Sequence, residues 1–131
     1  KVLFPKYTLA GCTSLYLTFN GCFSLQELDL SMLDFSTITN MYSAFYYALN
    51  LRTIYVGKYF DISNCSNFAD LFARCDVLQG GAGHFAIDLN PDLINPVTGL
   101  GSIGSWPEDL FELYFRPDTA QSPGVLTYKE L

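Results

Sequence analysis

The feature that most constrains this chain is a pattern of apolar residues that occurs twice, at an offset of 26 positions. It is seen when residues 24–51, SLQELDLSMLDFSTITNMYSAFYYALNL, are aligned with residues 50–78, NLRTIYVGKYFDISNCSNFADLFARCDVL. Apolar positions then match apolar positions: Leu25, Leu28 and Leu30 correspond to Leu51, Ile54 and Val56. After one inserted residue the offset becomes 27, and Asn40 matches Asn67. Each copy starts with close strand-like spacing and ends with the spacing of an amphipathic helix.

A period of this length around L-x-x-L-x-L is typical of leucine-rich repeats, whose units combine a short strand, a turn and a short helix. Because neither element buries its apolar face alone, the units must stack. We therefore predict an α/β fold, a short leucine-rich-repeat solenoid of strand-turn-helix units closed by an irregular, partly β C-terminal cap. The stack is expected over residues 1–78, with a partial N-terminal unit at 1–21 and two full units at 22–78. The cap is expected over residues 79–131, within one structural domain overall.

Composition excludes several classes of function. Half of the residues are hydrophobic and 16% are aromatic, which is typical of a folded chain and not of a disordered one. The net charge of -6 and the seven Lys and Arg residues argue against nucleic acid as a partner, because phosphate binding needs a basic patch. No apolar run is long enough to span a membrane. Since the first residue is Lys1 and not Met, we expect a processed or trimmed chain from which any signal peptide has been removed.

Four cysteines are present: Cys12, Cys22, Cys65 and Cys75. An even number permits disulfides. The repeat alignment favours free buried thiols instead, since Cys22 and Cys75 occupy the same core-facing position of successive units. No pair has the C-x-x-C spacing of a zinc site, so we predict no metal and no cofactor.

Catalytic and ion-binding motifs are weak. The single histidine, His84, follows a glycine-rich turn and is expected to be a solvated loop residue. Carboxylate pairs such as Glu27 with Asp29 and Glu108 with Asp109 are better explained as solvated positions than as acid–base machinery. The spacing of Asp88, Asn90 and Asp92 begins like a calcium loop, but Leu93 stands where the sharp-turn glycine belongs. We therefore predict that the chain is not an enzyme.

The segment GCFSLQELDLSMLDFSTITNMYSAFYY resembles the repeat of BspA-like leucine-rich-repeat proteins, which are common on the surfaces of host-associated bacteria. The residues that carry the resemblance are Gly21, Cys22, Ser24, Leu25, Leu28, Asp29, Leu30, Ser31, Asp34, Thr39, Asn40, Met41, Ser43 and Phe45. The tail DTAQSPGVLTYKE is also similar to the end of such proteins. The resemblance implies a secreted or cell-surface binding module, adhesin-like, whose partner is a protein or glycan of a host or neighbouring cell. It carries over no catalytic residue.

Residues between the leucines are expected to point to an exposed strand face, the surface through which repeat proteins commonly bind. These candidate ligand-binding residues are Gln26, Glu27, Asp29, Arg52, Thr53 and Tyr55. The helix positions Tyr42, Tyr46 and Tyr47 form either an interface or a packing contact with the next unit. An alternative function is that of a structural or assembly subunit, whose aromatic surfaces become buried in a homo- or hetero-oligomer.

Overall fold

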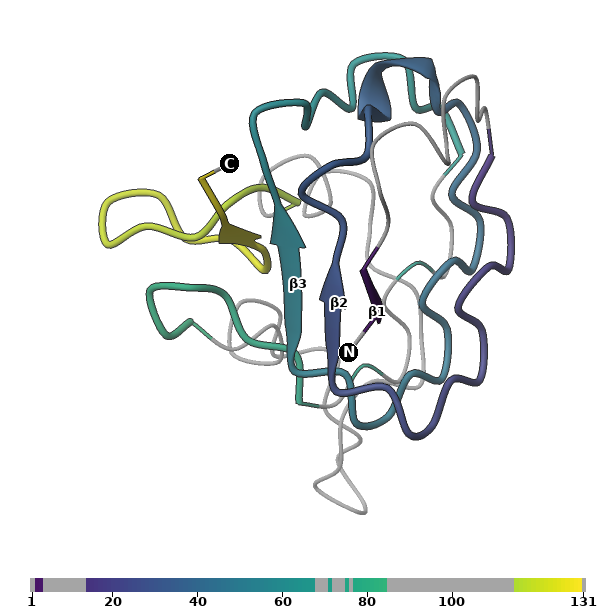
Figure 1. Cartoon of the computed structure of the whole chain (residues 1–131), viewed down its shortest axis with the longest axis horizontal. Helices are drawn as coiled ribbons and strands as arrows, with labels where there is room; N and C mark the ends of the chain where they lie inside the picture. Colours follow the sequence, from purple (N-terminus) through teal and green to yellow (C-terminus); the bar gives the residue numbers. More distant parts are fainter. Residues whose placement is uncertain are drawn as a thin grey trace.

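The computed structural model of the chain describes residues 2–3, 14–67, 71, 75, 77–84 and 115–130. These contain one sheet of four parallel strands that follow one another in chain order. The strands are β1 (Val2–Leu3), β2 (Glu27–Asp29), β3 (Thr53–Val56) and β4 (Thr127–Tyr128). Within the same residues the only helical element is η2, a single 3-10 turn at Phe35–Thr37 (Figure 1). β1, β2 and β3 lie side by side in that view, and β4 lies beyond β3.

The register of the sheet follows the offset of the sequence alignment. β2 pairs with β3 so that Leu28 lies opposite Ile54 and Asp29 opposite Tyr55, 26 residues apart. Leu28, Ile54 and Val56 are at most 1% exposed, and they place the apolar face of the sheet in the core.

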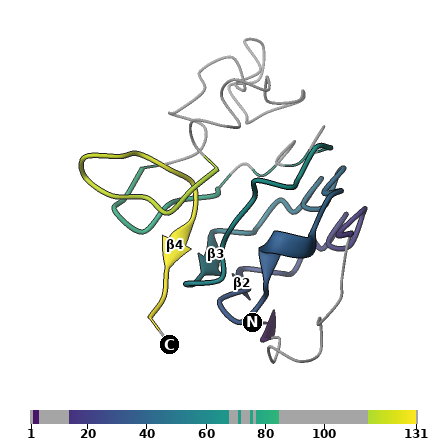
Figure 2. The same ribbon diagram turned by 90° about the horizontal axis from the view of Figure 1, so that it is seen from above.

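Opposite the sheet, two segments without regular secondary structure, residues 14–22 and 38–49, lie side by side and form what we call the turn wall (Figure 2). Their hydrogen bonds alternate. The amides of Leu15, Leu17, Phe19 and Gly21 donate to the carbonyls of Asn40, Tyr42, Ala44 and Tyr46 in the next segment. Of the intervening amides, those of Thr18 and Asn20 donate three residues back, to the carbonyls of Leu15 and Leu17, and that of Tyr16 donates to the Ser14 hydroxyl. Every second amide therefore links one segment to the next.

This pattern shows that the predicted fold class was wrong. We expected the second half of each copy to form a helix, with Tyr42, Tyr46 and Tyr47 on it in the first copy, and a helix needs each amide to donate to the carbonyl four residues earlier. In the turn wall alternate amides bond to the neighbouring segment instead, so no strand-turn-helix unit forms among the described residues. The apolar spacing of Met41, Phe45 and Ala48 comes from a chain of tight turns, which buries the same side chains as a helix would.

Left-handed residues recur at matching positions of the turn wall and also exclude a helix. Leu17 and Ser43 have φ of 56° and 52°, and Gly21 and Tyr47 have φ of 70° and 59°. Each pair is 26 residues apart, so the two segments repeat one backbone path. A left-handed conformation costs a non-glycine residue roughly 1–2 kcal/mol.

Leu17 offers a direct test of this backbone path. We expect Leu17→Gly to be more stable than Leu17→Ala by about 0.5–1 kcal/mol, because glycine adopts positive φ without steric cost. The same two substitutions at the exposed neighbour Tyr16 should rank in the opposite order. Chemical denaturation of the four variants checks this, and alanine ranking above glycine at position 17 would refute the assigned conformation.

The core lies between the sheet and the turn wall and draws side chains from both. Phe45 is fully buried, and its ring lies parallel to that of Phe19 with centroids 5.6 Å apart. Leu28, Met41 and Ala48 are also fully buried in this cluster. One continuous apolar core therefore joins the two walls.

Three of the four cysteines fall within the described residues, and none of the three is in a disulfide. Cys75 is buried and its Sγ lies 3.0 Å from the carbonyl oxygen of Phe45. Cys22 and Cys65 are only half-buried, less than expected, and burial raises the pKa of the Cys65 thiol. Cys12 lies outside the described residues.

The described part of the tail packs on the sheet. β4 pairs with β3, and the Lys129 amide extends this pairing by donating to the carbonyl of Val56. The calcium-like segment at 88–92 and the acidic residues Glu108, Asp109 and Glu112 lie outside the described residues. In the part of the chain that the structure describes, no helix has the length and apolar character needed to cross a membrane.

Candidate functional site

A polar hollow of about 280 Å³ opens where β2 and β3 begin. It is lined by Gln26, Glu27, Asn50, Arg52, Thr53 and Val77. Four of these, Gln26, Glu27, Arg52 and Thr53, are among the six strand-face residues expected from the sequence. Small-molecule pockets usually measure about 300–1,000 Å³, so this hollow suits one small group of a larger ligand.

Hydrogen bonds between matching positions of successive segments connect the residues that line the hollow. The amides of Arg52 and Thr53 both donate to the carbonyl of Gln26, and the amide of Gln79 donates to the carbonyl of Arg52. The Arg52 guanidinium also donates to Gln79 Oε1 over 3.0 Å. Gln26, Arg52 and Gln79 thus form one transverse row across three segments.

Asn50 fixes the side of the hollow. Its amide nitrogen donates to the Phe23 carbonyl over 2.6 Å, which anchors a side chain that is itself exposed. Val77 adds an apolar contact, since 40% of it is exposed. The lining therefore combines one cation, one carboxylate, two amides, a hydroxyl and one apolar side chain.

Asp29 does not belong to the exposed face, contrary to the expected alternation. Its side chain is fully buried, and it accepts hydrogen bonds from the amide and hydroxyl of Ser31 and from Lys129 Nζ at 2.5 Å. Burial raises the pKa of Asp29, but the bonds from Lys129 and Ser31 outweigh it and leave the pKa below its ordinary value. The Asp29 carboxylate is therefore paired with Lys129, a residue 100 positions further along the chain.

Tyr55 is half-buried beside this pair, with Lys129 Nζ 5.7 Å from its ring centroid. The hydrogen bond to Asp29 raises the pKa of Lys129. Asp29 and Tyr55 therefore hold the C-terminal strand, while the hollow occupies the other end of β2 and β3.

The helix tyrosines of the sequence prediction lie on the turn wall. The ring of Tyr42 stacks on that of Tyr16 with centroids 5.4 Å apart, and Tyr46 meets Tyr47 edge to face at 4.5 Å. All three predicted tyrosines are half-buried. None of them lines the hollow.

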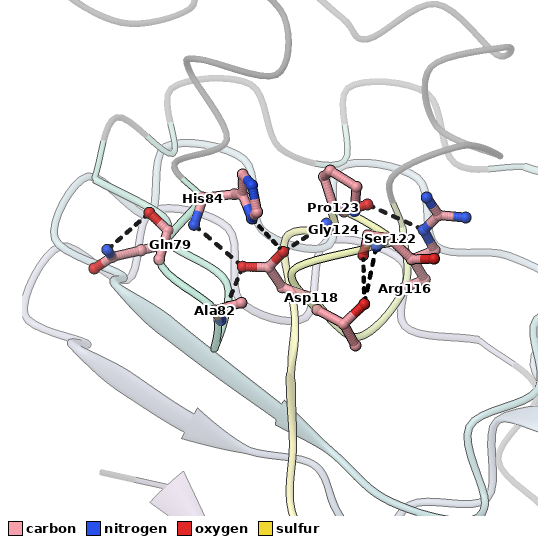
Figure 3. Close-up of polar contacts among 10 residues, drawn as sticks. Gln79, Ala82, His84, Arg116, Asp118, Ser122, Pro123 and Gly124 are labelled. Atoms are coloured by element: carbon pink, nitrogen blue, oxygen red, sulfur yellow. Dashed lines mark hydrogen bonds and ion pairs between the residues drawn. The ribbon is translucent and has the colours of Figure 1, made fainter.

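A second polar cluster surrounds Asp118, whose side chain is fully buried (Figure 3). Its Oδ2 accepts from the amides of Ala82 and His84, and its Oδ1 from the amide of Gly124. The His84 Nδ1 lies 2.7 Å from Oδ1. Burial raises the pKa of Asp118, and the hydrogen bonds more than offset this and hold it below its ordinary value.

The Asp118 cluster joins two loops and has the contacts of a structural site. His84 is not a freely solvated loop residue as expected, because both its ring and its amide bond to Asp118. A histidine held by a carboxylate forms two parts of a catalytic triad. Among the described residues no hydroxyl or thiol is hydrogen-bonded to the His84 ring, so the nucleophile of such a triad is not present there.

Glycines permit this close packing. A Cβ on Gly80 would overlap Asp118, and a Cβ on Gly124 would overlap the carbonyl of Arg116. Within the described residues, no group of three or more His, Cys, Asp or Glu side chains is arranged to hold a metal ion.

Sequence reasoning missed Asn50, Val77, Gln79, Lys129 and Asp118. Gln79 had a detectable signal, because extending the alignment of Leu51 with Leu78 by one residue places it beside Arg52. Lys129 and Asp118 had none, since their partners lie 100 and 34 residues away.

No protein-family model, curated protein or solved structure matches this chain.

Proposed function

We propose that this protein is a non-enzymatic binding module, adhesin-like and secreted or displayed on a bacterial cell surface. It recognises a protein or glycan through the polar hollow at the start of β2 and β3. The observation that carries the proposal is the lining of that hollow, in which four residues of the strand-face prediction meet. The resemblance to BspA-like proteins supports the same class of function and its location outside the cell.

The chemistry of the hollow favours a hydroxyl- or amide-rich group over a charged one. Arg52 and Glu27 carry opposite charges, so the lining has no excess of either sign. Asn50, Gln26 and Thr53 supply donors and acceptors for sugar hydroxyls or peptide groups. Since Arg52 is already bonded to Gln79, its guanidinium is held in place before a ligand arrives.

Binding of the purified chain to a panel of extracellular-matrix proteins and glycans tests this proposal. We expect saturable binding to at least one member, and a loss of about tenfold or more in the Arg52→Ala variant, since arginine is a frequent anchor at interfaces. Lys58→Ala is the matched control, because it removes a positive charge that is also exposed but lies away from the hollow. Equal losses in both variants, or no binding by the folded protein, would contradict the proposal.

A second candidate function is assembly with another polypeptide. It is favoured by two exposed aromatic side chains, Tyr16 on the turn wall and Phe23 directly after its outer segment, which are 52% and 54% exposed. Molecular mass in solution at micromolar concentration separates the two functions, since a binding module is expected to be monomeric and an assembly subunit to form a fixed oligomer.

A further inference from the structure

The outer segment of the turn wall, residues 14–22, and Phe23 directly after it have an unusual edge. This segment contains no charged residue, although the chain has 20 Lys, Arg, Asp and Glu residues (7 plus 13). Among the described residues five large apolar side chains are exposed, and three of them, Tyr16, Leu17 and Phe23, lie here. Exposed backbone edges are normally protected by charged side chains, especially lysine, against pairing with other chains. This edge lacks that protection.

The backbone of the segment shows what kind of partner fits. Its amides at Leu15, Leu17, Phe19 and Gly21 are used on the inner side, toward residues 40–46. The carbonyls of those inner residues, Asn40, Tyr42, Ala44 and Tyr46, each accept one amide. At the matching positions of the outer segment, the carbonyls of Tyr16, Thr18 and Asn20 accept no hydrogen bond from any described residue. These three residues are all exposed.

The side chain of Tyr16 is also contacted on its inner side. One face of the Tyr16 ring stacks on Tyr42, and the residue is still 52% exposed. The contact between the two segments of the wall therefore provides a template for a third segment placed outside them. Figure 2 shows residues 14–22, in purple, at the end of this row.

We propose that the outer edge of residues 14–23 binds an uncharged polypeptide segment of another chain, which donates backbone amides at every second residue. The partner supplies an aromatic or other apolar side chain to the open face of Tyr16. A second copy related by a twofold axis does not fit, because the two edges would present carbonyls to carbonyls. The partner must offer the donor side of its backbone, as residues 15–21 do toward residues 40–46. This proposal deepens the second candidate function, assembly with another polypeptide; it uses none of the residues of the hollow, so it stands or fails independently of the binding function proposed there.

A synthetic peptide of sequence SLYLTFNG, a copy of residues 14–21, is the probe, because its amides at the second, fourth, sixth and eighth positions have the required spacing. The control is the same peptide N-methylated at the second, fourth and sixth positions, which cannot donate there. Titration into the full chain, followed by amide NMR shifts, is expected to show saturable binding centred on Tyr16, Thr18 and Asn20. We expect the methylated peptide to bind at least about tenfold more weakly, which corresponds to about 1.4 kcal/mol.

Protein variants locate the bound peptide. Tyr16→Ala is expected to weaken binding several-fold, and Tyr128→Ala, which removes a tyrosine of similar exposure from β4, is expected to leave it unchanged. Equal binding of both peptides would overturn the proposal, as would the absence of binding. Binding that is unaffected by Tyr16→Ala would also overturn it, because the peptide would then not lie against the open face of Tyr16.

Discussion

Replacing Asp118 with alanine is expected to lower the free energy of unfolding by about 3–5 kcal/mol, the usual cost of breaking a buried, hydrogen-bonded charge site. The substitution leaves the amides of Ala82, His84 and Gly124 without their acceptor. The loops at 79–84 and 115–124 then lose their main polar link. For a domain of this size the melting temperature should fall by about 10–20 °C.

The control for this prediction is Asp61→Ala. Asp61 accepts a similar bond, from the Ser63 amide at 3.0 Å, but it is exposed to solvent. Its removal should change the melting temperature little. If Asp118→Ala melts as the unaltered protein does, the cluster in Figure 3 does not hold the two loops together.

The pH dependence of stability gives an independent check on Asp118. Because its pKa is lower in the folded chain than in the unfolded one, its stabilising contribution is complete above the unfolded value of about 3.9. That contribution is lost as the pH falls through the folded value. We expect the difference in unfolding free energy between the unaltered protein and Asp118→Asn to shrink between about pH 5 and pH 2. A constant difference across this range would contradict the assignment.

Phe45→Ala should cost about 3–5 kcal/mol of unfolding free energy, through lost burial and the cavity that remains. Phe45 is fully buried and contacts the segments on either side of its own through its ring and its backbone. Its amide donates to the carbonyl of Leu71, and its ring stacks on Phe19. Urea denaturation at neutral pH measures the cost, and Phe23→Ala, at a phenylalanine that is 54% exposed, should cost less than about 1 kcal/mol.

A double-mutant cycle at Phe19 and Phe45 isolates the ring contact. Aromatic pairs contribute about 0.5–1.5 kcal/mol beyond their buried area, so the combined loss should differ from the sum of the single losses by about that amount. Simple additivity would show that the two rings do not interact, and a loss below about 1.5 kcal/mol for Phe45→Ala would place it outside the core.

The sequence predicts correctly which apolar residues are buried, but it does not predict the backbone conformation of the segments that carry them. Leu28 and Ile54 pair at the offset seen in the alignment, and Phe45, Met41 and Ala48 are buried as their spacing indicates. A helix and a chain of tight turns with links between segments can bury the same set of side chains. The choice between them depends on where alternate amides bond, and that is decided by a neighbouring segment 25 or 26 residues away.

The residues predicted for the candidate site also include some whose exposure local spacing anticipates and one, Asp29, whose burial it does not. Gln26, Glu27, Arg52 and Thr53 reach the surface because they precede or begin their strands, which local spacing anticipates. Asp29 appears equivalent in the sequence, yet it is buried because Lys129 arrives from the far end of the chain. Strand alternation alone contains no information about such a distant partner.

The Asp29–Lys129 pair also has a consequence for how the chain folds during its synthesis. Neighbouring strands pair in the order in which they leave the ribosome, so β2 and β3 can associate while the tail is still being made. At about 5–20 residues per second, the 100 positions that separate the two partners take about 5–20 s to translate. During that interval the Asp29 carboxylate has only Ser31 as a partner and remains open to water. We expect the nascent domain to stay sensitive to protease until Lys129 emerges, so that formation of this ion pair marks the completion of folding.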